Sequence, residues 1–482
     1  MLKTFTFKNN QMKISKMLKS FISLIVFSVL MGCASKQYDN KNWDQLEAIL
    51  KEINPPVFPD QQYLITDFGA VGDGLTNSSD GIKRAIEFCH STGGGRVIVP
   101  KGKFLSGSIY LKSNVNLHLE EGAEILFSTN PDHYLPLVYT RWEGIELMNY
   151  SSLIYAFGEE NIAVTGKGIL NGQANAENWW KWKGKKEYGY VEGEPSQLDS
   201  GNRDRLFELA DQQVPVEERI FGSGYFLRPQ FIQPYRCKNV LIEGVKVMNS
   251  PMWVLNPVLC TNVTIDGVTI ESMGPNSDGC DPESCQNVLI KNCYFNTGDD
   301  CIAIKSGRNT DGRRVNIPSE NIVIQNCKMA NGHGGVVIGS EASGGVRNVF
   351  AENCTMDSPL LDRVLRIKTS SKRGGIIENV FLRNIEVGQV KEQVVRINMF
   401  YEDPGDFMPT VRNVEVQNMV VKNGGKVGVL AEGYEASPIS NIKLIDCDIS
   451  GVEVPYKLSN TKNISFQNVK INGEIIPEKV QQ

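Results

Sequence analysis

The chain has 482 residues, and its 50 basic and 55 acidic side chains give a formal net charge of −5. An acidic chain excludes a nucleic-acid binder, which needs a basic face for the phosphates. A hydrophobic content of 41% excludes a disordered chain, and 4 His against 11 Cys disfavour a histidine-rich metal site. We predict no cofactor and no metal. This length corresponds to about three domains, unless the chain is built from repeats.

Residues 1–33 have the pattern of a targeting segment. The apolar run from Phe21 to Leu30 follows five lysines, and it is too short to span a bilayer but suits a signal peptide. The motif Leu30-Met31-Gly32-Cys33 resembles the bacterial lipobox, which implies that Cys33 is lipidated and becomes the new N-terminus. An ordinary secretory signal is the alternative. We expect a bacterial cell-envelope protein that contacts the membrane only through this lipid.

Residues 34–60 are predicted to be a polar tether, because the segment is hydrophilic and contains three prolines. Translation from Met1 and translation from Met17 both give a leader of the expected kind. Residues 61–482 are expected to form a single domain, and we expect a monomer.

The segment 79–92 is predicted to form one amphipathic helix. Ser78-Ser79-Asp80 offers an N-cap, and Gly93 to Gly95 ends the helix. Its apolar residues follow helical spacing: Ile82, Ala85, Ile86 and Cys89. A helix of this kind is expected to cover the N-terminal end of a repeat domain.

Residues 173–235 interrupt the repeat that fills the rest of the domain. They contain several aromatic side chains, namely Trp179, Trp180, Trp182, Tyr188 and Tyr190. A long insertion in a repeat protein usually forms a wall or lid on one face. The aromatic rings either contact a ligand there or form a small core of their own.

From residue 239 onward one short pattern recurs, in which an Asn is followed by alternating residues and then, six positions later, by a small apolar residue. The copies begin at Asn239, Asn262, Asn287, Asn321, Asn348, Asn379, Asn413, Asn441 and Asn463, with a looser one at Asn161. The alternation predicts a strand in each copy, and no helix long enough for a crossover separates them. Such a repeat predicts stacked coils, a β-helix solenoid, in which the regular Asn forms a side-chain ladder.

The repeat also accounts for most cysteines. Cys293, Cys327, Cys354 and Cys447 occupy the plus-six position, where other copies carry Val, Ile or Met. We therefore predict that they are small core residues. A disulfide between Cys280 and Cys285 is the alternative.

The turns that follow four consecutive copies hold the most unusual polar residues: Asp278, Asp299, Asp300, His333, Arg366 and Lys368. Coils stack at about 4.8 Å, so these side chains are expected on one side of the solenoid within about 15 Å. Clustered carboxylates raise one another's pKa values, which keeps one protonated as an acid while another stays a base. Glycoside hydrolysis needs that division, with carboxyl groups about 6.5–9.5 Å apart for inversion and about 5 Å apart for retention.

These segments resemble a known family. The order Asn276-Ser277-Asp278, Gly298-Asp299-Asp300, Gly332-His333-Gly334 and Arg366-Ile367-Lys368 resembles the four signature segments of the polygalacturonases, glycoside hydrolase family 28. The family usually has Thr where this chain has Ser277, a change that preserves the hydroxyl. The resemblance implies an all-β, right-handed parallel β-helix that hydrolyses α-1,4-galacturonosyl linkages of pectin with inversion.

Matching positions imply the catalytic roles. Asp299 resembles the general acid, and Asp278 and Asp300 resemble the pair that activates water. His333 is implied to support the protonation of the acid.

Matching positions also imply substrate-binding residues. Arg366 and Lys368 resemble the residues that bind the galacturonate carboxylate, and Asn276 and Tyr401 resemble substrate contacts. Nearby cations are expected to extend the positive lining: Lys305, Arg308, Lys372 and Arg373. If the insertion at 173–235 closes one end of the groove, the enzyme cleaves from a chain end, which is the action we expect. An open groove would permit internal cuts.

Three alternatives remain open. A pectate-type polysaccharide lyase on the same fold would hold Ca²⁺ with the same carboxylates. A rhamnogalacturonan-active hydrolase is disfavoured by His333 and by the Arg-Ile-Lys segment. A non-catalytic glycan-binding β-helix would need no acid and base.

Overall fold

The computed structural model describes residues 42–479. The predicted signal peptide and the predicted lipidation at Cys33 lie outside the described residues. The chain divides into two compact units, Met1–Gln45 and Leu46–Gln482, and the second unit contains all the strands described below. Within residues 42–479 no helix is long and apolar enough to cross a membrane.

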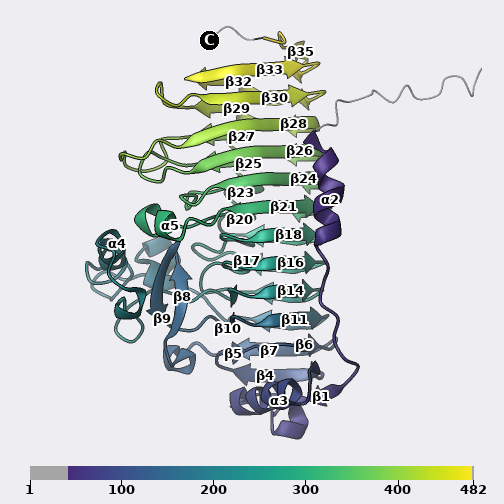
Figure 1. Ribbon diagram of the computed structural model, residues 1–482, viewed down its shortest axis with the longest axis vertical. Coiled ribbons are helices and arrows are strands. Elements are labelled where there is room, and N and C mark those ends of the chain that lie inside the picture. The colour runs from purple at the N-terminus through teal and green to yellow at the C-terminus, as the bar shows by residue number, and fades with distance from the viewer. Residues whose placement is uncertain (1–41, 480–482) are drawn as a thin grey trace, which may run out of the picture. The chain divides into compact units, whose positions relative to one another are not determined.

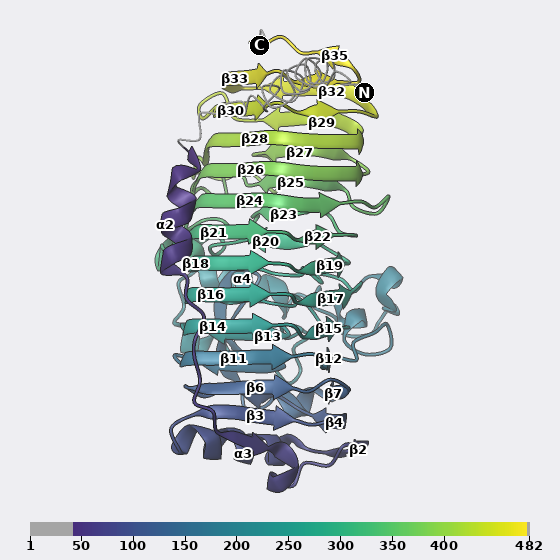
Figure 2. The same cartoon turned by 90° about the vertical axis from the view of Figure 1, so that its right-hand side faces the viewer.

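The second unit is a right-handed parallel β-helix, as predicted, whose coils contribute strands to three stacks (Figures 1 and 2). The first stack contains β1 (Gln62–Leu64), β3 (Gly95–Val99), β6 (Val115–Leu119), β11 (Glu160–Gly166), β14 (Lys238–Glu243), β16 (Thr261–Asp266), β18 (Gln286–Lys291), β21 (Ser319–Gln325), β24 (Val346–Met356), β26 (Ile376–Gln389), β28 (Thr410–Asn423), β30 (Ile439–Ile445) and β33 (Thr461–Gln467). These strands are the predicted Asn repeats together with the coils that precede them.

The second stack follows the first around each coil. It contains β2 (Asp73–Asn77), β4 (Gly102–Ser106), β7 (Ala123–Phe127), β12 (Ile169–Asn171), β15 (Lys246–Met248), β17 (Thr269–Ser272), β19 (Tyr294–Thr297), β22 (Lys328–Met329), the C-terminal parts of β24, β26 and β28, then β31 (Asp448–Ile449) and β34 (Lys470–Ile471). The last short strand, β35 (Glu474–Ile475), pairs with β34 in the antiparallel direction.

The third stack carries the candidate site. It contains β5 (Ile109–Tyr110), β10 (Ile154–Phe157), β13 (Ile232–Tyr235), β20 (Ile302–Ile304), β23 (Val336–Ile338), β25 (Arg363–Lys368), β27 (Gln393–Asn398), β29 (Gly425–Glu432) and β32 (Val452–Ser459). Between β13 and β20 the stack continues through isolated bridges at Leu255 and Cys280.

The coil interior is filled by the apolar positions of the repeat, including the cysteines. The plus-six residues Cys293, Cys327 and Cys354 are buried in the main core together with Val268 and Ile385. Every cysteine of the described residues is buried and unpaired, so the prediction of small core residues is confirmed. The alternative of a Cys280–Cys285 disulfide is wrong, because both thiols lie free in the core.

The predicted asparagine ladder is present along the first stack. The Asn321 side-chain amide donates to Asn287 Oδ1 at 2.9 Å, and Asn348 donates to Asn321 Oδ1 at 3.1 Å. Each Asn has a left-handed backbone, with φ of 58° at Asn321, which Asn tolerates better than most side chains. A second ladder runs five residues later in the repeat, where Asn384 donates to Asn353, and we had not predicted it.

The predicted N-terminal helix is α3 (Ser79–Ser91), but its capping differs from the prediction. The Ser78 hydroxyl accepts a hydrogen bond from the Val71 amide instead of capping the helix. Asn77 Oδ1 accepts from the Ser79 amide and takes that role at the first turn. A short 3-10 helix, η2 (Ile65–Phe68), precedes β2.

The segment predicted as a tether contains a helix, α2 (Asp44–Glu52). Leu46, Ile49 and Ile53 are buried, because they share one face at helical spacing. The Asn54 amide then donates to Asn262 Oδ1 at 3.0 Å, so this part of the chain is fixed to the asparagine ladder.

The insertion lies between β12 and β13 and contains the 3-10 helices η4 (Trp180–Lys183), η5 (Lys186–Tyr188) and η6 (Val216–Glu218) and the helix α4 (Arg203–Asp211). Trp179 is buried with its ring against Tyr134 and Trp182. The Trp180 indole donates to the Ser250 carbonyl at 2.9 Å. Trp179 belongs to the main core of the β-helix, and Trp180 and Trp182 pack against that core, so these tryptophans anchor the insertion to the coils instead of forming a core of their own.

Two further protrusions lie beside the insertion and were not predicted. One is an antiparallel hairpin of β8 (Val138–Trp142) and β9 (Ile145–Asn149), which follows the 3-10 helix η3 (Pro131–Tyr134). The other is the short helix α5 (Asn309–Val315). Figure 1 shows α4, α5 and the hairpin on the same side of the coils. Side chains from the hairpin and the insertion share a small second core, including Trp142, Leu206 and Phe221.

Candidate active site

The structure brings the predicted site residues together. Asp278 follows β17, Asp299 and Asp300 lie between β19 and β20, His333 lies between β22 and β23, and Arg366 and Lys368 lie on β25. All of them except Asp300 line one cleft of about 510 Å³, which Asn276 and Tyr401 also line. Successive coils of the same stack place these segments side by side, as the repeat spacing predicts.

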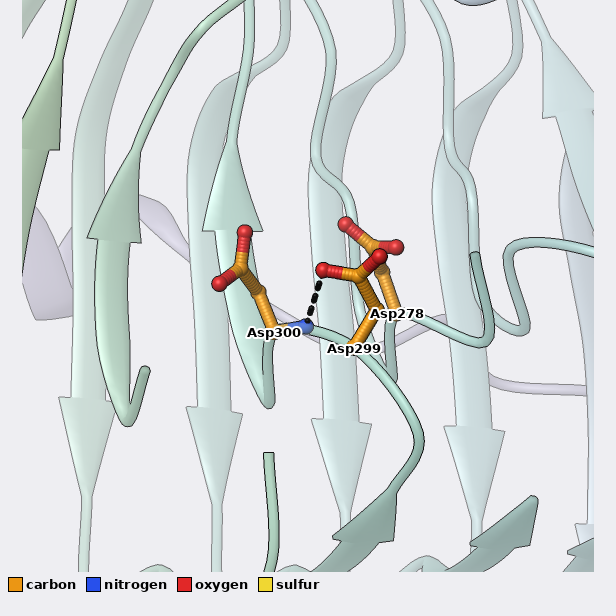
Figure 3. A group of neighbouring side chains, drawn as sticks. All are labelled: Asp278, Asp299 and Asp300. Carbon is orange, nitrogen blue, oxygen red and sulfur yellow. Dashed lines mark hydrogen bonds between the residues drawn. The ribbon is translucent and has the colours of Figure 1, made fainter. Parts of the chain in front are cut away.

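Three carboxylates lie close together at the cleft, and two of them, Asp278 and Asp299, line it (Figure 3). Asp278, Asp299 and Asp300 each place one oxygen within 4.8 Å of the other two. The Asp300 amide donates to Asp299 Oδ1 at 3.0 Å, which fixes the Asp299 side chain relative to the turn. Asp300 is fully buried, whereas 20% of the Asp299 side chain is exposed to the cleft.

Each carboxylate has its own cationic partner. His333 Nδ1 donates to Asp299 Oδ1 at 2.9 Å, and Lys368 Nζ donates to Asp300 Oδ2 at 2.6 Å. Lys305 Nζ lies 3.5 Å from Asp278 Oδ2. Because the charges are compensated one by one, three acidic groups are stable in a small volume.

The electrostatics distinguish Asp278 from Asp299. Burial and the neighbouring charge of Asp299 raise the pKa of Asp278 to about 7. Burial would also raise the pKa of Asp299, but the hydrogen bond and charge of His333 outweigh it and hold this pKa below its ordinary value. The same hydrogen bond raises the pKa of His333 to about 8. Near neutral pH the group therefore keeps one proton on a carboxyl and a second on the imidazole.

Behind Asp278 lies a buried charge cluster that sequence reasoning only partly identified. Lys305 lies 3.5 Å from Asp281 Oδ1 and 3.2 Å from Glu341 Oε2, and all three side chains are buried. We had predicted Lys305 as a lining cation but gave no role to Asp281 or Glu341. Burial raises the pKa of Asp281 well above its ordinary value, so its carboxyl stays protonated beside Asp278.

One wall of the cleft is closed by ion pairs between separate loops. Arg308, at the start of α5, lies 3.5 Å from Glu143 of the β8–β9 hairpin and 3.4 Å from Glu402, which follows β27. Arg308 lines the cleft as predicted. Arg373 does not line it, because it is buried behind the wall and bonds to Glu402 at 2.7 Å. Lys372 is likewise absent from the lining.

The insertion closes the end of the cleft nearest the N-terminal coils. Lys183 of η4 lines the cleft, and its amine donates to Asn276 Oδ1 at 2.7 Å. The buried Arg228 donates to the same oxygen at 2.9 Å. Asn276 is thus held by two cations from the insertion, contacts that only the folded insertion reveals.

Tyr401 lies where the resemblance implied a substrate contact. Its ring lies 5.5 Å from the Arg366 guanidinium and 5.3 Å from the Lys368 amine. The ring is 40% exposed, so one part of it packs against the two cations while another part faces the cleft. Such an amphipathic ring next to cations suits a sugar acid.

The three carboxylates are also close enough to hold a cation. However, both Asp300 oxygens already accept bonds from Lys368 and Arg366. A bound divalent ion would have to compete with these protein cations.

Comparison with known proteins agrees with the site. The family model described as "Glycosyl hydrolases family 28" matches residues 225–474. The chain is 28% identical over 439 residues to an "Exo-poly-alpha-D-galacturonosidase" of Dickeya chrysanthemi, covering 85% of this chain and 70% of that protein. It is 27% identical over 424 residues to a "Probable polygalacturonase" of Vitis vinifera, covering 83% of this chain and 77% of that protein.

A solved structure resembles the chain over nearly its whole length. The hyperthermoactive exopolygalacturonase from Thermotoga maritima is 48% identical, with a TM-score of 0.88, and the match covers 90% of this chain and 97% of that one. The family match spans more than half of the chain and includes all four segments that carry the clustered acids and cations. The chain therefore belongs to the glycosyl hydrolases of family 28.

Proposed function

We propose that the protein is an exo-acting polygalacturonase that hydrolyses α-1,4-galacturonosyl linkages of polygalacturonate or oligogalacturonides from a chain end. The observation that carries the proposal is the arrangement of side chains in the cleft. The Asp299–His333 pair lines the cleft opposite Arg366 and Lys368, and the insertion contributes a wall beside them. The exopolygalacturonase of Thermotoga maritima and the exo-galacturonosidase of Dickeya chrysanthemi support the same assignment.

In this proposal Asp299 protonates the leaving glycosidic oxygen, because its carboxylate is the exposed one of the three. Asp278 and Asp300 activate the water that attacks the anomeric carbon. The shared proton resides on Asp278, whose pKa is raised to about 7, and it passes to Asp299 before the bond breaks. His333 stabilises Asp299 as an anion after the transfer.

Arg366 and Lys368 bind the carboxylate of the substrate. A guanidinium forms two parallel hydrogen bonds to a carboxylate, and an ammonium supplies a compact charge. These cations allow an acidic protein to bind a polyanion, since the local charge at the cleft is positive where the substrate acid lies.

Inversion is proposed from the family resemblance, and it predicts that the first product is the β-anomer. The carboxylate oxygens lie within 4.8 Å of one another, closer than the roughly 6.5–9.5 Å typical of inverting pairs. Proton NMR of the product within the first minutes of reaction measures the anomer directly. An initial α-anomer would indicate retention and would contradict this part of the mechanism.

The pH dependence follows from the two raised pKa values. We expect kcat/KM to fall as the pH rises through about 7 to 8, because Asp278 and His333 lose their protons over this range. The measurement is initial rate against pH at low substrate concentration. In His333→Gln the fall should begin near the same pH but lack the second, steeper step near pH 8, because only the carboxyl proton remains to be lost. A kcat/KM that rises above about pH 8 would contradict the assigned proton donor.

Two competing functions are separated by one assay on polygalacturonate. A hydrolase releases reducing ends without an unsaturated product, and a chelator leaves its rate unchanged. A calcium-dependent lyase generates a product that absorbs near 235 nm, and a chelator stops it. A glycan-binding protein without catalysis gives neither signal, so each result identifies one class.

We also propose a lipid anchor at Cys33 and a place in the bacterial cell envelope. The lysine-rich start, the apolar run to Leu30 and the Leu30-Met31-Gly32-Cys33 motif support this proposal. Expression of the full chain and of Cys33→Ser, with mass spectrometry of the mature N-terminus, tests it. Equal masses without an acyl addition would reject the anchor.

A further inference from the structure

Arg396 lies one coil beyond the cations of the catalytic cleft. It is on β27, and the strand register pairs it directly with Arg366 of β25. Residues paired in register on neighbouring parallel strands project from the same face of the sheet. Arg396 is therefore the next cation in line with Arg366, on the side of the C-terminal coils.

Arg396 differs from the other arginines of this face in its hydrogen bonding. Arg366 donates to Asp300, and Arg363 donates to Gln393. Arg396, in contrast, makes no hydrogen bond or ion pair with any residue in 42–479. It is half-buried, and its charged or polar neighbours are Arg366, Glu432, Glu392 and Tyr401. A half-buried guanidinium next to a second one, with carboxylates nearby but in no ion pair or hydrogen bond with it, leaves N–H donors that a bound anion would satisfy.

The sheet that carries the catalytic cleft continues in the direction of Arg396. The insertion and the β8–β9 hairpin contribute Lys183 and Glu143 to the lining from coils before the catalytic ones, and Glu402 contributes to it from the segment after β27. On the other side β27, β29 and β32 continue the same sheet. A chain whose terminal sugar lies at the wall must therefore continue over β25 and then β27.

We propose that Arg396 forms a further binding site for a galacturonate carboxylate, two sugars beyond the terminal one. This inference rests on the proposed exo-polygalacturonase function and extends it to chain-length preference. Arg366 and Lys368 bind the sugar next to the scissile bond, and Arg396 binds the following sugar, while Tyr401 is a neighbour of all three cations. A disaccharide ends before Arg396, and a trisaccharide reaches it.

The test compares digalacturonate and trigalacturonate as substrates for the wild type and Arg396→Gln. We expect Arg396→Gln to lower kcat/KM for trigalacturonate by about 10- to 100-fold, the effect of one lost charged hydrogen-bond pair. The value for digalacturonate should stay within about twofold, since that substrate does not reach the residue. Arg396→Lys keeps the charge and should recover part of the loss.

Lys457→Gln is the matched control. Lys457 lies on β32 in the same row, because Arg396 pairs with Leu430 and Leu430 pairs with Lys457. It is two coils further on, beyond the reach of a trisaccharide, so neither substrate should be affected.

The outcomes are distinct. Equal losses of kcat/KM on both substrates would show that Arg396 acts through the catalytic cleft. An unchanged kcat/KM for trigalacturonate would show that Arg396 does not contact the third sugar. Either result overturns the inference. If the wild type hydrolyses neither substrate, the proposed function fails instead. Calorimetric binding of trigalacturonate to the wild type and to Arg396→Gln would then still decide on Arg396, because a carboxylate site requires weaker binding by the variant.

Discussion

Replacing Asp299 with Asn is expected to lower kcat on polygalacturonate by about a thousandfold. Asn cannot donate the proton that the leaving oxygen needs, but its amide oxygen can still accept the hydrogen bond from His333. The fold should therefore persist, with a melting temperature close to that of the wild type. The measurement is the release of reducing ends together with a thermal unfolding curve.

Asp362→Asn is the control for this change. Asp362 lines the same cleft but lies outside the carboxylate group, and it pairs with Arg363 at 3.2 Å. Loss of a partly exposed pair should change kcat by no more than about threefold. If Asp299→Asn retained activity comparable to that of Asp362→Asn, Asp299 would not be the acid.

Replacing Lys368 with Met should lower kcat/KM by about a hundredfold or more. Lys368 is buried and donates to Asp300 at 2.6 Å, so its loss leaves a buried carboxylate with only Arg366 as partner, at 3.4 Å. Truncating one member of a buried charged pair typically costs about 2–5 kcal/mol. The substrate carboxylate loses one of its two cations as well, so KM should rise while kcat falls.

Lys372→Met tests whether the loss of activity expected in Lys368→Met depends on the position of the lysine or only on the loss of one positive charge. Lys372 is close to Lys368 in sequence, but its side chain does not line the cleft. The control should behave as the wild type. Should Lys368→Met unfold, Lys368→Arg preserves the charge, and a wild-type kcat/KM in that variant would show that the exact position of the ammonium is unimportant.

The fold was predictable because it repeats. Alternation of apolar and polar residues within each copy defines the strand, and the Asn at its start defines the left-handed turn. Every coil repeats this local pattern, and the coils stack on one another. The cysteines were identified as core residues for the same reason, since Cys354 shares its register position with Ile385. The position of the catalytic groups followed as well, because Asp299 and His333 occupy equivalent turns of neighbouring coils.

The walls of the cleft could not be predicted, because they are built by segments outside the repeat. Lys183 and Arg228 reach Asn276 only because the folded insertion packs against the coils and the β8–β9 hairpin. Glu143 meets Arg308 although 165 residues separate them in sequence. No spacing rule connects such residues, so their contacts depend on tertiary packing alone.

The predicted helix cap was wrong because a nearby backbone amide competes for the serine hydroxyl. The Ser78-Ser79-Asp80 segment was predicted to cap α3, but the Ser78 hydroxyl bonds to the loop amide of Val71, and Asn77 supplies the bond at the helix start.

For the tryptophans of the insertion, the sequence left two roles open, ligand contact and internal packing. Trp179 and Trp182 pack against neighbouring rings, and the residues that reach the cleft from this segment are cations.

The most direct test of the account is a time course of products from polygalacturonate with the unmodified enzyme, followed by anion-exchange chromatography and viscosity. The account predicts one short saturated product from the first sample onward, with viscosity falling slowly as chains shorten from an end. A ladder of intermediate oligomers with a rapid loss of viscosity would show internal cleavage. That result, or an unsaturated product, would contradict an exo-acting hydrolase.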